Sequence, residues 1–225
     1  MPIRVNALAV MAKAPIAGTV KTRLVPPLTP AQAAEVYHAL LRDQLKHLKA
    51  LTVADLYVAY APRHARAVFA DILPPGFCCF PQRGEDLGAR MGTVFDHLLD
   101  REYEKVVLIG SDLPALPLNY VERAFESLSI RRNRVVLGPS RDGGYYLVGM
   151  NRRTPEMFQG MRWSHDQVLA QTLTKLAALG IDNELLPVWF DVDTVEDLRR
   201  LQAWSDPRAM EALKNTLCLL RGFEF

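Results

Sequence analysis

The feature that most constrains the fold is the alternation of short apolar runs with longer segments of helical periodicity. Residues 5–11, 56–61 and 105–110 are apolar and rich in β-branched side chains, as buried strands are. Residues 30–51 instead carry apolar side chains at helical spacing, with Thr29 as the predicted N-cap. This alternation is typical of a mostly parallel sheet with helices on both faces, so we predict an α/β fold.

The same patterns assign the rest of the chain. Strands are predicted at 77–80, 134–137, 145–149 and 183–186, and helices at 63–72, 86–99, 118–128, 167–179, 194–203 and 207–220. The two strands that flank the sequence SRDGG are expected to pair antiparallel, which makes the sheet mixed. Because no repeat or linker divides the chain, we predict one domain over residues 1–225, extended by a C-terminal helix at about 207–221.

Composition limits the classes of function. The net charge of +2 gives no general field that would attract nucleic acid, so no nucleic-acid partner is expected. No apolar run approaches the roughly 20 residues that span a bilayer, so no membrane partner is expected either. The three cysteines, Cys78, Cys79 and Cys218, lack the spacing of a metal site. They predict reduced, buried thiols in a cytoplasmic protein.

The loop after the first predicted strand, MAKAPIAGTVKTRL, combines cations with glycine. Lys13, Lys21 and Arg23 lie just beyond the carboxyl end of that strand, where open α/β sheets bind ligands. Lysine and arginine suit phosphate, and Gly18 would let the backbone approach it closely. The loop lacks the glycines of a Walker A or dinucleotide-binding motif. It is therefore either a different kind of phosphate site or a solvated loop with surface cations.

Three aspartates are candidates for a metal site near this loop. Asp112 directly follows a predicted strand, and Asp191 and Asp193 lie two residues apart, on one side of an extended segment. Three carboxylates beside phosphate-binding cations suit Mg²⁺, which takes oxygen ligands. The alternative is that they form turns and caps, as we expect for Thr194, which has capping-box spacing to Asp197.

Further candidates lie on glycine-bearing segments. Asp142, Gly143 and Gly144 form either a hairpin turn or a surface where a sugar or phosphate approaches the backbone closely. Arg90 follows two glycines near a predicted helix start and faces either a ligand or solvent.

Taken in order, the motifs KAPxxGxxKTRL, GxDLGxRM, GSDLP, DGGYYL and DxDTxxDL resemble a bacterial family of glycosyltransferases in the nucleotide-diphospho-sugar transferase (GT-A) superfamily. The resemblance runs from Ala7 to Leu201, and the family is linked to arsenosugar biosynthesis. More distantly, the motifs are similar to those of 2-phospholactate guanylyltransferases. The resemblance implies a Rossmann-like three-layer α/β/α sandwich with a mixed, mostly parallel sheet. Such a fold binds a nucleotide at the carboxyl ends of its N-terminal strands.

The resemblance also implies roles for the candidate residues. The donor's phosphates would be bound by Lys13, Gly18, Lys21, Arg23 and Arg90. A divalent metal, Mg²⁺ or Mn²⁺, would be held by Asp112, Asp191 and Asp193. Catalysis would depend on Asp112, Lys21 and Arg23. The acceptor side would be lined by Asp142, Gly143 and Gly144. Apart from the resemblance, the aromatic-polar segment WSHD before a predicted helix places His165 either near this side or on the surface.

We therefore predict a metal-dependent transferase that uses a nucleotide-activated donor, with nucleotide-sugar glycosyl transfer as the leading hypothesis. The alternatives are nucleotidyl transfer to a small phosphorylated acid, and a nucleotide- or nucleotide-sugar-binding protein without turnover. The expected partners are a nucleotide-activated small-molecule donor and a small-molecule acceptor. The apolar face of the tail helix covers either the sheet or a second subunit, so the sequence is compatible with both a monomer and a homo-oligomer.

Overall fold

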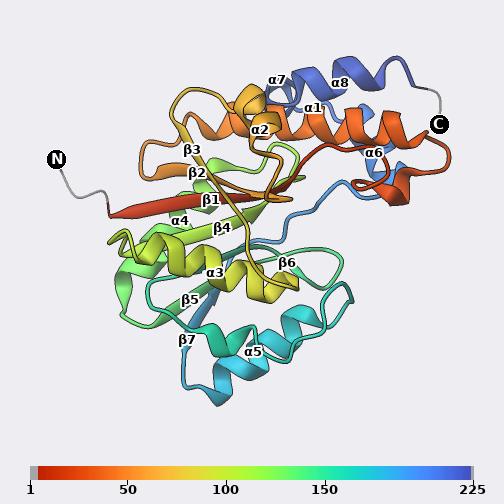
Figure 1. The fold of residues 1–225 in the computed structure, drawn as a ribbon. Coiled ribbons are helices and arrows are strands. Elements are labelled where there is room, and N and C mark those ends of the chain that lie inside the picture. Colours follow the sequence, from red (N-terminus) through yellow and green to blue (C-terminus); the bar gives the residue numbers. More distant parts are fainter. Residues whose placement is uncertain (1–4, 224–225) are drawn as a thin grey trace.

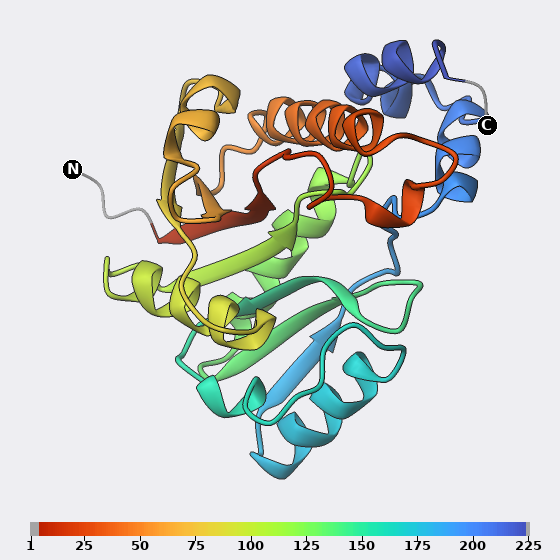
Figure 2. The same cartoon turned by 45° about the vertical axis from the view of Figure 1, so that its right-hand side comes forward.

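Seven strands form one mixed sheet in the computed structural model, which describes residues 5–223 (Figure 1, Figure 2). The order across the sheet is β3-β2-β1-β4-β6-β5-β7, and only β6 runs antiparallel to its neighbours. The strands are β1 (Asn6–Lys13), β2 (Asp55–Ala61), β3 (Phe77–Pro81), β4 (Lys105–Gly110), β5 (Arg134–Pro139), β6 (Tyr145–Met150) and β7 (Asp182–Leu185). The predicted mixed α/β sheet is confirmed, as is the antiparallel pairing around SRDGG.

Different helices cover the two faces of the sheet, because successive strand residues point to opposite sides. In β1, Leu8 and Val10 face a core shared with α1, α2 and α4, whereas Ala7 and Ala9 face a core shared with α3 and α5. The helices are α1 (Pro30–Leu48), α2 (Arg66–Ile72), α3 (Leu87–Leu99), α4 (Leu118–Ile130), α5 (Val168–Ala178), α6 (Val195–Gln202), α7 (Pro207–Ala212) and α8 (Lys214–Leu220). Short 3-10 turns lie at η1 (Thr22–Leu24) and η2 (Pro155–Met157).

Several helix starts follow from local capping chemistry. Thr29 and Gln32 form a reciprocal capping box at the start of α1, and Thr194 and Asp197 form one at the start of α6. The Asp86 side chain accepts a hydrogen bond from the backbone N–H of Ala89 and caps α3. The predicted capping box at Thr194 is therefore confirmed, and Asp197 belongs to that cap.

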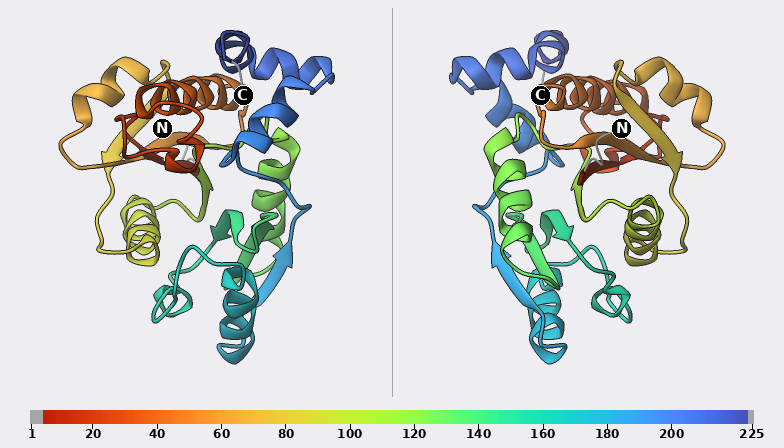
Figure 3. Two further views of the ribbon diagram at one scale, coloured as in Figure 1. Left: turned by 90° about the vertical axis from the view of Figure 1, so that its right-hand side faces the viewer. Right: turned by 90° about the vertical axis from the view of Figure 1, so that its left-hand side faces the viewer.

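The tail differs from the prediction of one helix over residues 207–220. It forms two short helices, α7 and α8, because Leu213 leaves helical geometry with φ −109° and ψ 20°. The tail covers the outer side of α1 and contacts α6, where Leu213 and Leu220 join a separate buried cluster (Figure 3). The buried Asp43 carboxylate of α1 anchors α8 by accepting bonds from the backbone N–H groups of Asn215 and Thr216.

The predicted buried environment of the cysteines is wrong for two of the three. Cys78 and Cys218 are exposed, and Cys79 is partly buried on the edge strand β3. All three are free thiols. Among the described residues, no helix combines the length and apolar character needed to cross a membrane.

The carboxyl ends of β1, β4 and β5 meet at one edge of the sheet, together with the start of β6. Antiparallel β6 begins where its parallel neighbours end, so the turn between β5 and β6 lies at this edge. The segment after β7 returns to the same place, because the backbone N–H of Val192 donates to the Asp112 carbonyl at 3.2 Å. The topology therefore gathers the predicted loop, turn and acids at one edge.

Candidate functional site

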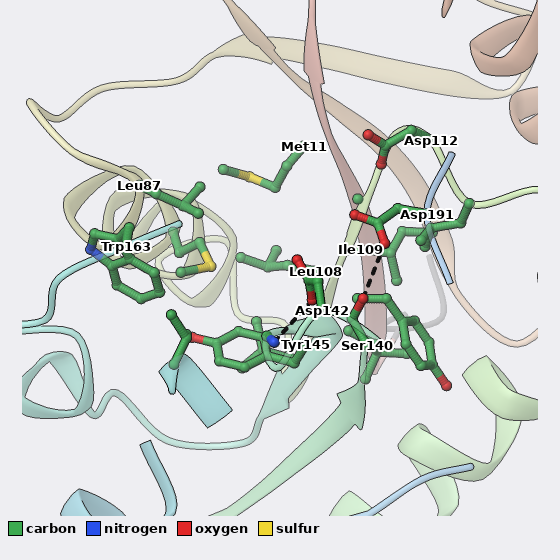
Figure 4. A pocket seen from close by; sticks show the side chains of 18 of the residues that line it. Met11, Leu87, Leu108, Ile109, Asp112, Ser140, Asp142, Tyr145, Trp163 and Asp191 are labelled. Atoms are coloured by element: carbon green, nitrogen blue, oxygen red, sulfur yellow. Dashed lines mark hydrogen bonds between the residues drawn. The ribbon is translucent and has the colours of Figure 1, made fainter. Parts of the chain in front are cut away.

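A cavity of about 240 Å³ lies at this edge of the sheet. Its wall includes the carboxylates of Asp112, Asp142 and Asp191, together with apolar side chains from both sides (Figure 4). Asp112 and Asp191 are drawn on one side of the cavity, and Trp163 and Leu87 on the opposite side. The cavity therefore has an acidic side at the strand ends and an apolar side toward α3.

Lys21 contacts two of the predicted metal-site acids directly. Its Nζ donates to Asp112 Oδ2 at 2.6 Å and to Asp193 Oδ1 at 2.9 Å. The Lys21 side chain is only 4% exposed, whereas those of Asp112 and Asp193 are 26% and 35% exposed. The buried Lys21 ammonium therefore links the basic loop to these acids by hydrogen bonds. Lys21 and Asp112 are separated by more than 90 positions in the sequence.

The charge of Lys21 depends on these two carboxylates. Burial alone would lower the pKa of the ammonium, because a low-dielectric interior disfavours the charged form. The negative charges and hydrogen bonds of Asp112 and Asp193 outweigh burial and raise the pKa above its ordinary value. Lys21 therefore stays protonated. Its charge neutralises part of the negative charge of Asp112, Asp191 and Asp193, which we call the acidic edge.

Asp191 lies close to the negative charges of Asp112, Asp193 and Asp142. It accepts a hydrogen bond from Ser140 Oγ at 3.1 Å, and it lines the cavity. Burial raises the pKa of its carboxyl to about 6, assisted by the charges of Asp112, Asp193 and Asp142. Asp191 and Asp193 therefore have different surroundings, although they lie on the same extended segment.

The other predicted phosphate-binding residues lie outside the cavity. Arg23 is 67% exposed at its side chain, and its Nη1 lies 3.5 Å from Asp193 Oδ2. Lys13 is exposed at the end of β1, and Gly18 has a φ of +78° with open space around the position of a Cβ. Arg90 donates from Nε to the Gly84 carbonyl, so it braces the loop before α3.

The Asp-Gly-Gly segment forms the hairpin turn between β5 and β6. Asp142 Oδ1 accepts from the backbone N–H of Gly144 at 3.0 Å, and both residues line the cavity. Gly143 instead packs against protein, because a Cβ there would lie 2.0 Å from the Asp166 carbonyl oxygen. Its φ of +86° also favours glycine. The segment is therefore a turn whose first and last residues face the cavity.

Sequence reasoning did not identify the supports of Asp112 or the apolar side of the cavity. The buried hydroxyl of Tyr37 contacts Ser111 Oγ at 2.8 Å and accepts from the Lys13 backbone N–H, so it links β1 to the residue before Asp112. Trp163 reaches α3 because Gly88 leaves room: a Cβ at Gly88 would lie 2.5 Å from its ring. The glycine in DLGAR was the available signal for this contact.

The acidic edge fits a hard divalent cation that also contacts a ligand. Carboxylate oxygens are suitable ligands for Mg²⁺ or Mn²⁺, and the pKa of Asp191 is raised first by burial and then by the charges of Asp112, Asp193 and Asp142. Within residues 5–223, no group of three or more His, Cys, Asp or Glu side chains has the arrangement of a complete metal site. A cation at these carboxylates would need further ligands from substrate phosphates and water.

Comparison with solved structures identifies close and distant relatives of this fold. A protein from Desulfovibrio desulfuricans G20, provisionally named a nucleotide-diphospho-sugar transferase, is 34% identical, with a TM-score of 0.88 over 97% of this chain and 95% of that one. A cytidylyltransferase from Leptospira borgpetersenii is 12% identical, with a TM-score of 0.59 over 98% of each chain. Rv0371c from Mycobacterium tuberculosis H37Rv, solved in complex with manganese, is 17% identical, with a TM-score of 0.52 over 87% of this chain and 96% of that one.

The two distant structures share the fold, whereas the first shares both fold and sequence over nearly the whole chain. No curated protein matches the sequence. Residues 44–165 match the family described as uncharacterized protein conserved in bacteria, DUF2064. The chain belongs to this family.

Proposed function

We propose that the protein is a metal-dependent transferase that uses a nucleotide-activated donor, and that the transferred group is a sugar. The observation that supports this most directly is the arrangement of the acidic edge between two different surfaces. On one side, the loop between β1 and α1, which we call the η1 loop, carries the cations Lys13, Lys21 and Arg23, and these suit a diphosphate. On the other side lies a cavity large enough for a small group. The relative from Desulfovibrio desulfuricans, which bears a transferase name, supports the same reaction class.

The cations of the loop would act in two ways. Arg23 and Lys13 have exposed side chains that would bind the donor's phosphates, and a guanidinium can do so through two parallel hydrogen bonds. The buried Lys21 ammonium, bonded to Asp112 and Asp193, would contribute its positive charge from behind these carboxylates. These charges would stabilise the leaving diphosphate as negative charge develops on it.

Asp112 and Asp191 would hold the divalent cation at the cavity, and Asp193 would fix Lys21 beside them. A bound Mg²⁺ or Mn²⁺ would supply Lewis-acid neutralisation of the donor's phosphate oxygens. Ser140 donates to Asp191, so it orients that carboxylate toward the acidic edge. The manganese complex of Rv0371c supports testing both metals.

In the glycosyl reaction, an acceptor oxygen or nitrogen forms a bond to the anomeric carbon of the sugar. The bond from that carbon to the donor's β-phosphate oxygen breaks, and its electron pair leaves with the nucleoside diphosphate. The acceptor's proton passes to solvent water. Asp142 and Gly144 would face the acceptor, because both line the cavity beside the acidic edge.

The test separates three outcomes by the products released. Purified protein is incubated with panels of nucleotide sugars and nucleoside triphosphates, with Mg²⁺, Mn²⁺ or a chelator, together with a mixed acceptor panel. Release of a nucleoside diphosphate from a nucleotide sugar supports glycosyl transfer. Release of pyrophosphate from a triphosphate supports nucleotidyl transfer, the alternative favoured by the fold shared with the cytidylyltransferase. Nucleotide binding without turnover supports a binding protein.

A matched pair of variants shows whether any turnover belongs to this site. Asp112→Asn removes one charge from the acidic edge, and Asp71→Asn makes the same change on the exposed surface of α2. We expect Asp112→Asn to reduce metal-dependent turnover at least about a hundredfold, whereas Asp71→Asn should match the parent protein. Equal activity of the two variants would contradict the proposed site. A thermal-shift panel with and without metal reports the base preference independently of turnover.

A further inference from the structure

The charge of the cavity wall is one-sided. Asp112, Asp142 and Asp191 line it, and within residues 5–223 no lysine or arginine does. The cations of the η1 loop lie beyond the carboxylates, with Lys21 bound to Asp112 and Asp193. Arg141, next to Asp142, lies over the ring of Phe190, 4.9 Å from its centroid. An anionic group inside the cavity would therefore face three carboxylates, and the one ammonium beside them, that of Lys21, is already bonded to Asp112 and Asp193.

The wall opposite the acids is apolar. Leu87 and Met91 project from the first turns of α3, and Trp163 and Val168 approach from the segment before α5 and its start. Met91 and Val168 are buried, whereas Leu87 is 44% exposed at the mouth. Such a surface stabilises the apolar part of a ligand by removing it from water.

Given the proposed function, we propose that the acceptor is an uncharged or cationic small molecule with an apolar body. It presents a hydroxyl or amine to the acidic edge and packs its apolar body against Leu87, Met91 and Trp163. A phosphorylated acid is disfavoured in the cavity, because the described lining residues offer three carboxylates and no lysine or arginine, and the divalent cation of the proposed site would be occupied by the donor's phosphates. This assignment separates the present site from transferases whose acceptors carry phosphate.

The experiment measures charge selection in the absence of any donor. Ligand-observed NMR titrations compare benzyl alcohol, benzylamine, benzoate and benzyl phosphate, which share a ring and differ in charge, at low ionic strength to limit screening. We expect benzylamine and benzyl alcohol to bind at least about tenfold more tightly than the two anions, a difference of about 1.4 kcal/mol. Benzyl phosphate binding as tightly as benzyl alcohol would overturn the proposal. Dissociation constants weaker than about 10 mM for both favoured probes would overturn it as well.

Two arginine variants assign the selection to this cavity. Leu87→Arg places a cation at the mouth and should raise benzyl phosphate affinity at least about tenfold. Val68→Arg makes a similar exchange at an exposed apolar residue of α2, which does not line the cavity, and should leave the order of the probes unchanged. Equal responses of the two variants would contradict the assignment. Because no donor is present, failure of the transferase proposal would appear only in the turnover panel, and failure here would appear only in the titrations.

Discussion

Replacing Asp191 by asparagine should stabilise the folded protein at neutral pH. The substitution removes one charge from the acidic edge while keeping the size of the side chain. The new amide group is uncharged, yet its oxygen can still accept a hydrogen bond from Ser140 Oγ, as the carboxylate does. The change therefore isolates the electrostatic cost of the ionised carboxylate from its packing.

The expected size follows from the pKa of this carboxyl, which rises from 3.8 to about 6 on folding. Each unit corresponds to about 1.4 kcal/mol, so ionised Asp191 disfavours folding by at most roughly 3 kcal/mol. Because the residue is partly open to solvent, we expect Asp191→Asn to gain about 1–2 kcal/mol in the free energy of unfolding.

The stabilisation expected from Asp191→Asn depends on pH. Folding raises the pKa of Asp191, so the parent protein keeps its full stability below about pH 4, where this carboxyl is protonated, and loses stability as the pH rises through 6 and the carboxyl ionises. The gain from Asp191→Asn should therefore be largest near about pH 7.5 and fall by more than half toward about pH 4.5.

Urea denaturation of the parent protein and the variant at several pH values measures this difference, with Asp71→Asn as an exposed control. A variant less stable than the parent at neutral pH, or a gain that does not change with pH, would refute the electrostatic reasoning. In the parent protein, Mg²⁺ should recover part of the same stability if the cation binds this carboxylate.

Three further substitutions test the rest of the site. Lys21→Met leaves two carboxylates without their buried cation and should cost about 2–3 kcal/mol in urea denaturation, below the value for a fully buried pair because the acids are partly exposed; a loss under about 0.5 kcal/mol would show that water replaces the ammonium. Gly143→Ala should cost at least about 2 kcal/mol through its contact with the Asp166 carbonyl, whereas Gly160→Ala, also at positive φ but in open space, should cost only about 1 kcal/mol. Arg23→Gln should raise the KM for the donor about tenfold with little change in thermal stability, and Arg208→Gln on the exposed tail should alter neither.

Local patterns were sufficient to predict most of the fold. The strand Lys105–Gly110 was predicted at its observed bounds because a short apolar run followed by Gly-Ser-Asp allows few alternatives. Thr29 and Thr194 were predictable as caps because the capping interaction spans only three residues. The break at Leu213 was not predictable in this way, because Leu213, Leu217 and Leu220 keep a helical spacing and the tail follows the surface of α1 and α6.

The site was predictable as a set of residues but not as a set of contacts. Strand ends indicated that Asp112 and the basic loop share one edge, since parallel strands bring their carboxyl ends together. Nothing local indicates that Lys21 adopts a left-handed backbone, with φ 49°, and turns its ammonium inward. Trp163 was equally hidden, because it lies in an irregular segment and meets α3 only through the space left by Gly88.

The basic loop between β1 and α1 separates its cations by exposure. Lys21 is buried and bonds to two of the four carboxylates at this edge, so its single charge offsets one of the four, while Arg23 remains in solvent beside Asp193. One buried cation beside four acids leaves an excess of negative charge, which adds to burial, the larger cause, in raising the pKa of Asp191. A site with this balance is electrostatically incomplete when empty, and a divalent cation carried with a diphosphate would complete it. That cation would be occupied by the donor's phosphates, so an anionic acceptor would still meet the carboxylates of the cavity wall without a lysine or arginine from the described lining residues.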